Sequence, residues 1–140
     1  HMPFSGTLQS MNYIPGNLFS VNPTTVKSVD NLFARNERLS CIFETKRGPL
    51  AVVLVGAMIV AGIRVVWEHN PFLKNRVIQR FKYPSKGEGV VKIKKGEEIG
   101  KFMLGSTVVV CFPKNTIIWE KHIRSNSIIK MGESIAKFKH

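Results

Sequence analysis

Residues 92–102, KIKKGEEIGKF, recur 36 positions later as residues 128–138, IIKMGESIAKF. Seven of the eleven positions are identical in the two copies. A repeated segment of this length usually marks a repeated supersecondary element. Each copy has a Gly-Glu pair at its centre with apolar residues on both sides, which predicts a strand, a tight turn and a second strand. The sequence therefore predicts a strand–turn–strand unit that the fold uses twice.

The remaining segments also read mainly as short strands, expected at residues 6–14, 18–21, 39–45, 77–83, 108–112 and 117–121. The apolar run at 50–63, LAVVLVGAMIVAGI, is shorter than the roughly 20 residues that cross a bilayer as a helix. Its glycines and its Val and Ile content predict two buried strands with a bend between them. We expect a single, mainly β domain over residues 1–140, a sandwich or barrel-like arrangement of short antiparallel strands.

Helical structure is expected only between residues 22 and 38. Asn22 and Pro23 are typical of a helix N-cap followed by the first helical residue. One or two short helices, or an irregular segment, are predicted to follow as far as Arg38.

The charge is strongly basic, with 21 Lys and Arg against 9 Asp and Glu and a net charge of +12. Such a balance favours an anionic partner, either a nucleic acid or an anionic membrane surface. No helix-turn-helix, zinc or RNA-recognition pattern is present, so nucleic acid is not the expected partner. Four basic residues alternate near the predicted strand at 77–83 and could share a face, namely Lys74, Arg76, Arg80 and Lys82.

Few side chains are suited to catalysis or metal binding. Cys41 and Cys111 lie far apart without CxxC spacing, so free thiols are expected and no metal site is predicted. Three of the histidines are expected at the surface: His69, His122 and His140.

Residues 104–107, LGST, follow the first copy of the repeat and have no counterpart after the second. A Gly-Ser pair between strands indicates a turn, but it also suits self-processing, in which the Ser106 hydroxyl attacks the Gly105 carbonyl. The resulting ester loses the serine Cα proton and expels the carboxylate, and the dehydroalanine hydrolyses to a pyruvoyl group. This chemistry needs a base, and His1 is the candidate.

Four segments resemble the phosphatidylserine decarboxylase family: SVN at 20–22, LFARNER at 32–38, VGA at 55–57 and KGEEIGKFMLGST at 95–107. The resemblance extends over essentially the whole chain, and LGST in this setting is specific to the bacterial and mitochondrial-type enzymes. HMPFSG at 1–6 also fits the H-x-P-x-x-G segment of the family. The chain resembles the C-terminal part of the catalytic domain.

The resemblance implies a carboxy-lyase of phospholipid biosynthesis that is made as a zymogen. Cleavage between Gly105 and Ser106 would give a β chain of residues 1–105 and an α chain of residues 106–140, which stay together. Ser106 would become the pyruvoyl cofactor, which forms a Schiff base with the amine of phosphatidylserine, and loss of CO₂ would lead to phosphatidylethanolamine. His1 matches the family's base for Ser106, and no metal is implied.

Two features of the family pattern are not matched. The aspartate that orients the family's histidine lies upstream of it, whereas Asp30, the single Asp here, lies outside that motif. The second family histidine and the membrane-binding N-terminal helices are also not matched. We therefore expect the chain to begin in mid-domain and to process itself poorly or not at all, because nothing orients His1.

Substrate contacts can be suggested, each with a structural alternative. The polar cluster at 35–38 could meet the lipid head group or could simply hold a loop onto the sheet. Apolar residues near His1 could line an acyl-chain slot or belong to the core, and Thr107 adjoins the cleavage site. The candidates are Met2, Phe4, Leu18, Phe19, Arg35, Asn36, Glu37, Arg38 and Thr107.

The implied partners are phosphatidylserine, an anionic membrane surface and the second chain of the same precursor, with a homodimer also compatible. The implied location is the cytoplasmic side of a bacterial plasma membrane, or the mitochondrial inner membrane in a eukaryote. The alternative function is a non-catalytic β-rich carrier or binding domain, because the glycine turns resemble lipoyl and biotinyl carrier hairpins. Lys94, Lys95 and Lys130 fit a carrier lysine poorly, however, and LGST would have no role.

Overall fold

The computed structural model describes residues 1–57, 63–68, 77–102 and 107–139, and it is mainly β, as expected. Two short helices, α1 (Pro23–Ser28) and α2 (Leu32–Arg35), lie between the first two strands. Within the described residues, no helix has the length and apolar character needed to cross a bilayer. The strands are β1 (Gly6–Ile14), β2 (Arg38–Thr45), β3 (Gly48–Val55), β4 (Ile63–Val65), β5 (Gln79–Lys82), β6 (Lys92–Ile93), β7 (Gly100–Phe102), β8 (Thr107–Cys111), β9 (Ile117–Trp119) and β10 (Ala136–Phe138).

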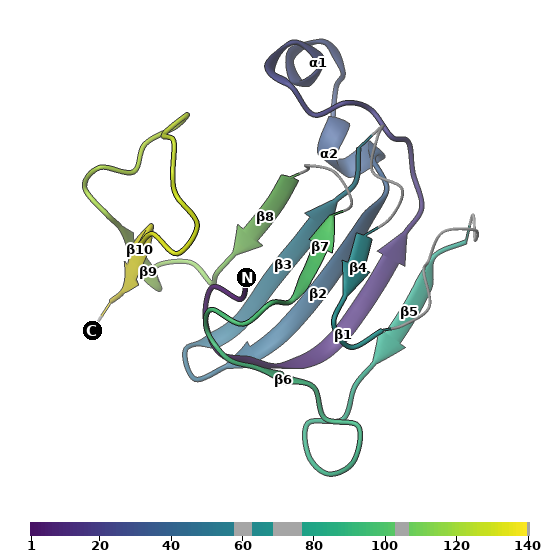
Figure 1. Cartoon of the computed structure of the whole chain (residues 1–140), viewed down its shortest axis with the longest axis vertical. Coiled ribbons are helices and arrows are strands. Elements are labelled where there is room, and N and C mark those ends of the chain that lie inside the picture. The colour runs from purple at the N-terminus through teal and green to yellow at the C-terminus, as the bar shows by residue number, and fades with distance from the viewer. Residues whose placement is uncertain (58–62, 69–76, 103–106, 140) are drawn as a thin grey trace.

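The main sheet is antiparallel and has six strands, in the order β5-β1-β2-β3-β8 with β6 pairing with β1. A separate antiparallel pair, β4–β7, lies over one face of this sheet (Figure 1). The β9–β10 pair stands to one side, beyond β8. The described part of the fold is therefore an open sheet covered on one face, with an attached C-terminal unit, residues 116–139.

The hydrophobic core lies between the main sheet and the β4–β7 pair. A register shift between Leu8 and Ser10 inserts one extra residue in β1, so Leu8 and Met11 are both fully buried despite their odd spacing. Ile63 and Val65 of β4 pack into the same cluster, and each is 5% exposed. Burial of such side chains contributes about 1.5–3 kcal/mol each, so β4 and β7 are held mainly by this contact.

Most expected strands form, but the one predicted at 18–21 is wrong. The backbone N–H and C=O of Phe19 bond to the Asn36 side chain at 3.0 and 2.8 Å, so this segment satisfies its backbone without a neighbouring strand. The apolar run at 50–63 contains most of β3, from residue 50 to residue 55, and the first residue of β4, while 58–62 fall outside the described residues. The helix start is confirmed, because Asn22 Oδ1 accepts the Thr25 N–H at 2.9 Å.

The two copies of the repeat build the same turn. Gly96 and Gly132 have φ of 85° and 84°, a region that favours glycine. The backbone N–H of Lys94 donates to Glu97 Oε2 at 2.7 Å, and that of Lys130 donates to Glu133 Oε2 at 2.8 Å. The glutamate of each Gly-Glu pair therefore closes its own turn.

The strand that follows each turn also pairs equivalently, which the sequence did not reveal. Gly100 of β7 lies opposite Val65 of β4, and Ala136 of β10 lies opposite Trp119 of β9. The strand expected before the second turn is the exception. Ile128 and Ile129 are not in a strand, whereas the first copy has β6 at this position.

Candidate functional site

A pocket of about 260 Å³ opens beside the N-terminal residue and between the two layers of the fold. Its walls come from β3, β7 and β8, and their side chains are mostly apolar. The lining residues are His1, Pro3, Val52, Leu54, Ile99, Gly100, Lys101, Phe102, Val108 and Val110.

The turn of the first repeat positions His1 at this pocket. The Met2 N–H donates to the Glu97 carbonyl at 2.8 Å, and the Gly96 N–H donates to the Met2 carbonyl at 2.8 Å. The Met2 side chain is 1% exposed and belongs to the core. The Lys95 N–H also donates to Ser5 Oγ at 2.9 Å. Both the N–H and the C=O of Met2 are thus hydrogen-bonded, which fixes the residue next to His1. The His1 side chain remains exposed.

Gly105 and Ser106 lie outside the described residues, but the strands on either side of them are described. Phe102 ends β7 and pairs with Ile63 of β4, in the covering layer. Thr107 begins β8 and pairs with Val55 of β3, in the main sheet. The strands before and after residues 103–106 therefore lie in different layers, and both line the pocket that includes His1.

Thr107 shares one row of the sheet with the polar cluster at 35–38. Arg38 pairs with Val55, and Val55 pairs with Thr107, so Arg38 and Thr107 are two strands apart in the same row. At about 4.8 Å between neighbouring strands, this separation is about 10 Å along the sheet. Both predicted contacts therefore lie at the end of the sheet where residues 103–106 enter β8.

Within the cluster, the described contacts are structural. Asn36 is 0% exposed, and its amide donates to the carbonyls of Phe19 and Gly56 at 2.8 and 2.9 Å. The Arg38 guanidinium donates to the Ala34 and Asn36 carbonyls at 2.7 and 3.0 Å, at the C-terminal end of α2. These bonds support the interpretation in which the cluster holds a loop onto the sheet.

Arg35 and Glu37 make different contacts. The Arg35 guanidinium lies 4.9 Å from the centre of the Phe19 ring, and the residue is exposed. Glu37 Oε2 accepts the Tyr13 hydroxyl at 3.1 Å. Burial, and then the charge and hydrogen bond of Glu37, raise the pKa of Tyr13 from 10.0 to about 12.

Met2 and Phe4 do not line the His1 pocket. Met2 is a core residue, as the structural alternative expected. Phe4 borders a second, more open groove of about 670 Å³ together with Lys46 and Lys92. The Phe4 ring also contacts Phe138, with 4.4 Å between the ring centres, and so connects the N-terminal segment with the C-terminal unit.

Both cysteines are free thiols, as expected, with Cys41 buried and Cys111 exposed. Burial raises the pKa of the Cys41 thiol from 9.0 to about 12, so it behaves as a core residue. Across the described ranges, no three or more His, Cys, Asp or Glu side chains are grouped so that they could hold a metal ion.

Comparison with known proteins identifies the family. The family model for phosphatidylserine decarboxylase matches residues 1–137. The chain belongs to the phosphatidylserine decarboxylase family. A phosphatidylserine decarboxylase proenzyme of Saccharophagus degradans is 51% identical over 137 residues, which is 98% of this chain and 47% of that protein. A proenzyme of Pseudomonas fluorescens strain Pf0-1 is 47% identical over 98% of this chain and 48% of its own length. The chain thus spans about half the length of the curated relatives it matches.

Sequence reasoning identified His1 but missed the walls of its pocket. Val52 and Leu54 of β3, and Val108 and Val110 of β8, alternate along their strands and so present one face. That alternation was visible in the sequence. What the sequence lacked was the pairing of β3 with β8, which places both faces on the same pocket.

Proposed function

We propose that this chain forms the catalytic part of a pyruvoyl-dependent phosphatidylserine decarboxylase, which converts phosphatidylserine to phosphatidylethanolamine. Family membership over residues 1–137 supports the reaction class. The observation that carries the site assignment is the pocket in which His1 meets β7 and β8, the two strands that flank residues 103–106.

Self-cleavage between Gly105 and Ser106 would produce chains 1–105 and 106–140, with His1 as the base that takes the Ser106 hydroxyl proton. The described contacts would keep the two chains together after cleavage. The whole of β8 pairs with β3 across the cut, from Thr107 to Cys111. Phe138, on the C-terminal side of the cut, packs on Phe4. A cut in this position leaves both layers anchored.

The residues of the pocket fit a pyruvoyl group at Ser106. Its carbonyl would supply an electrophile for the substrate amine and a sink for the electrons released as CO₂ leaves. The side chains that β3 and β8 contribute to the pocket are apolar. Lys101 is the Lys or Arg side chain in the described lining, and it suits the phosphate or carboxylate of a serine phospholipid head group.

An anionic leaflet is the proposed surface from which this substrate is taken, so the protein would work in association with a membrane. Arg80 and Lys82 are exposed on β5, which forms an edge of the main sheet. Each basic residue near an anionic leaflet contributes about 1 kcal/mol of attraction. Lys74 and Arg76, expected on the same face, lie outside the described residues.

A chimera tests the proposal. These 140 residues would replace the matching half of the Saccharophagus degradans proenzyme, which keeps the rest of a complete enzyme around them. Intact-mass measurement should give two fragments that divide at Gly105/Ser106, the second beginning with a pyruvoyl group, and the preparation should form phosphatidylethanolamine. The Ser106→Ala chimera should remain one chain and be inactive.

These 140 residues on their own should process poorly, because no carboxylate of the described residues is bonded to His1. Under the carrier-domain alternative, the chimera would remain whole and a lysine of a repeat turn would carry the modification. A chimera that folds but neither divides at 105/106 nor forms phosphatidylethanolamine would overturn the proposed function.

A further inference from the structure

The two repeat units differ sharply in how well their apolar residues are covered. In the first unit, Ile93 and Val65 are 8% and 5% exposed. Their counterparts in the second unit, Ile129 and Trp119, are 51% and 59% exposed. Further large apolar side chains are exposed in the second unit: Ile118 at 56%, Ile128 at 97% and Met131 at 83%. The second unit therefore carries several large apolar side chains that nothing in the described chain covers.

In the first unit, a neighbouring strand supplies the cover that the second unit lacks. There, β6 pairs antiparallel with β1, with Ile93 opposite Gly6 and Lys92 opposite Thr7. Ile128 and Ile129 occupy the place of β6 in the second unit, yet within the described residues their backbone groups have no hydrogen-bond partner. What the second unit lacks is therefore a neighbouring strand equivalent to β1.

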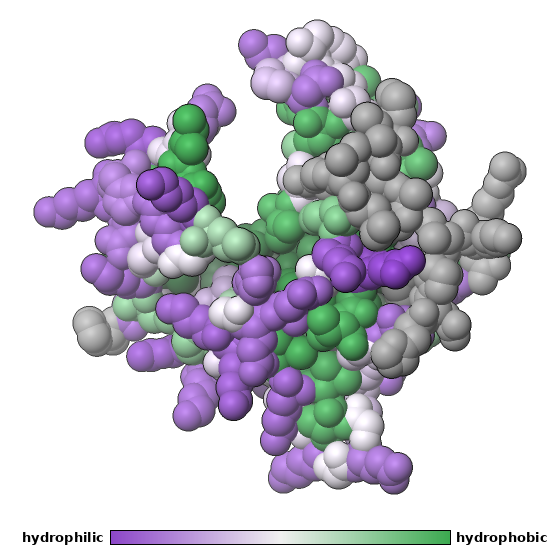
Figure 2. Space-filling view, in the orientation of Figure 1, coloured by the Kyte–Doolittle hydropathy of each residue, from purple (hydrophilic) through white to green (hydrophobic). Residues whose placement is uncertain are grey.

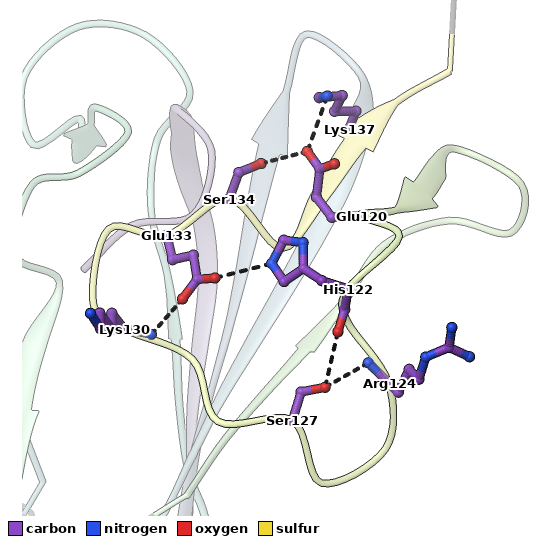
Figure 3. A network of polar contacts seen from close by, with 8 residues as sticks. All are labelled: Glu120, His122, Arg124, Ser127, Lys130, Glu133, Ser134 and Lys137. Atoms are coloured by element: carbon purple, nitrogen blue, oxygen red, sulfur yellow. Dashed lines mark hydrogen bonds and ion pairs between the residues drawn. The ribbon is translucent and has the colours of Figure 1, made fainter.

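The second unit is otherwise well formed. Its β9–β10 ladder has three residue pairs, and the turn is closed by the Lys130–Glu133 bond. Polar contacts join the loops around it (Figure 3). His122 Nε2 lies 3.0 Å from Glu133 Oε1, while Glu120 Oε1 accepts the Ser134 hydroxyl at 3.0 Å and lies 3.2 Å from Lys137 Nζ. The exposed apolar side chains thus belong to a folded unit that is held together by its own hydrogen bonds and ion pairs.

The surrounding shape leaves room for an added segment. Figure 2 shows a notch between the C-terminal unit and the main body, and apolar surface lies along the edge of the unit that borders it. On the other side stands β8, which pairs only with β3 among the described strands and exposes Val108 and Val109 by 47% and 37%.

We propose that an extended polypeptide strand adds to residues 128–129 and covers the exposed apolar side chains of the second unit, as β1 does for the first. Its source is the half of the family's sequence that this chain does not match, since the curated relatives are about twice as long. The proposal rests on the repeat and on family membership and does not require the decarboxylation chemistry.

Two other occupants fit the observations less well. Lipid chains offer no hydrogen bonds to the backbone of Ile128 and Ile129, whereas a strand does. A second copy of the same surface would bring like charges together, because residues 116–139 contain five Lys and Arg but two Glu. Both glutamates are already engaged within the unit. The fitting strand therefore alternates apolar residues, which face Ile129 and Met131, with acidic or neutral ones.

Hydrogen exchange provides the first test. In this chain, the amides of Ile128 and Ile129 should exchange at nearly the rate of an unfolded peptide. In the complete Saccharophagus degradans proenzyme, the aligned amides should exchange at least about 100-fold more slowly, because they would belong to a paired strand.

A matched substitution provides the second test. Ile129→Ser in this chain should change the melting temperature little, because the side chain is half exposed. The aligned substitution in the complete relative should lower it by about 5–10 °C, the effect of opening a buried contact in a protein of that size. Val26→Ser is the control, since Val26 is 39% exposed on α1, which has no buried residue, and it should behave alike in both proteins.

Four results would overturn the proposal. The aligned amides could exchange fast in the complete relative, or the aligned substitution could lower the melting temperature there no more than in this chain. Vesicles of phosphatidylcholine containing phosphatidylserine could protect residues 128–131 of this chain while the complete relative leaves them open, which would identify a bilayer as the occupant. Protection that disappears on dilution of this chain would instead identify a second copy. Failure of the chimera to decarboxylate leaves each of these readouts unaffected.

Discussion

Gly96 and Met2 are joined by a 2.8 Å hydrogen bond from the glycine N–H to the methionine carbonyl. The same turn accepts the Met2 N–H at the Glu97 carbonyl. The repeat therefore does more than supply a hairpin-like scaffold, since its first turn holds the residue next to His1. The second turn has the same φ at its glycine but bonds to no residue of the described N-terminal segment.

This difference gives a matched pair of variants, Gly96→Ala and Gly132→Ala. Neither added Cβ would meet an atom within 4 Å, so the cost in each is backbone strain at positive φ, about 1–2 kcal/mol. Urea unfolding should show a similar loss of unfolding free energy for both variants. Only Gly96→Ala should accelerate hydrogen exchange at the Met2 amide and shift the His1 imidazole resonances. Equal perturbation of His1 by both variants would contradict the proposed role of the first turn.

Gly100 and Ala136 occupy equivalent places in the two units, but we expect them to tolerate substitution differently. A Cβ on Gly100 would lie 2.3 Å from the Arg64 carbonyl oxygen, so β4 and β7 would have to separate. We expect Gly100→Ala to lower the free energy of unfolding by about 2–3 kcal/mol, the usual effect of overpacking.

The reverse change, Ala136→Gly, is the control and should cost only about 0.5–1 kcal/mol, because it adds backbone freedom without creating a clash. Thermal and urea unfolding of the two variants measure both effects. Equal losses would show that the β4–β7 contact is looser than its geometry indicates.

The buried amide of Asn36 should not tolerate a carboxylate. Asn36→Asp would place oxygen against the Phe19 and Gly56 carbonyls, which now accept hydrogen bonds, and would bury an unpaired charge. The expected loss is about 3–5 kcal/mol at neutral pH. Asn22→Asp is the control, since Asn22 is an exposed N-cap whose Oδ1 accepts the Thr25 N–H, and Asp caps helices equally well. A loss below about 1 kcal/mol for Asn36→Asp, by urea unfolding, would contradict this account.

Local patterns in the sequence predicted the fold class, most strands and the turn glycines, because each depends on a few neighbouring residues. The prediction of a strand at 18–21 was wrong for a non-local reason, since Asn36 replaces a neighbouring strand as the hydrogen-bond partner of Phe19. The strand expected before the second turn, at 128–129, was wrong for the converse reason. Its residues have strand character, but the described chain supplies nothing for them to pair with.

The site shows the same division between local and non-local information. Residue type and spacing indicated His1, Gly105 and Ser106, and family resemblance gave them roles, which remain predictions. The pocket walls depend on β3 pairing with β8 and on β7 lying over the sheet, which no local pattern encodes. The sequence left two interpretations of Asn36 and Arg38, as head-group contacts or as residues that hold a loop onto the sheet. Only the structure showed that their polar atoms bond to the backbone of neighbouring segments.

Alkaline pH should destabilise the fold through Tyr13 and Cys41. The pKa of Tyr13 is raised from 10.0 to about 12 and that of Cys41 from 9.0 to about 12, so the folded chain keeps both protons at pH values where the unfolded chain releases them. Stability from these groups is complete below about pH 9 and falls as the pH rises towards 12. Each unit of pKa difference corresponds to about 1.4 kcal/mol.

Melting temperatures measured from about pH 8 to about pH 11 should therefore decline, with the decline beginning where the unfolded Cys41 thiol ionises. Tyr13→Phe removes one of the two titrating groups together with its bond to Glu37. The variant should be less stable than the parent at neutral pH but should lose less stability between about pH 10 and pH 11. The ultraviolet absorbance of tyrosinate, followed in parallel, reports whether Tyr13 ionises before or during unfolding. A Tyr13→Phe profile parallel to that of the parent over this interval would show that burial and the Glu37 contact do not hold the phenol proton in the folded chain.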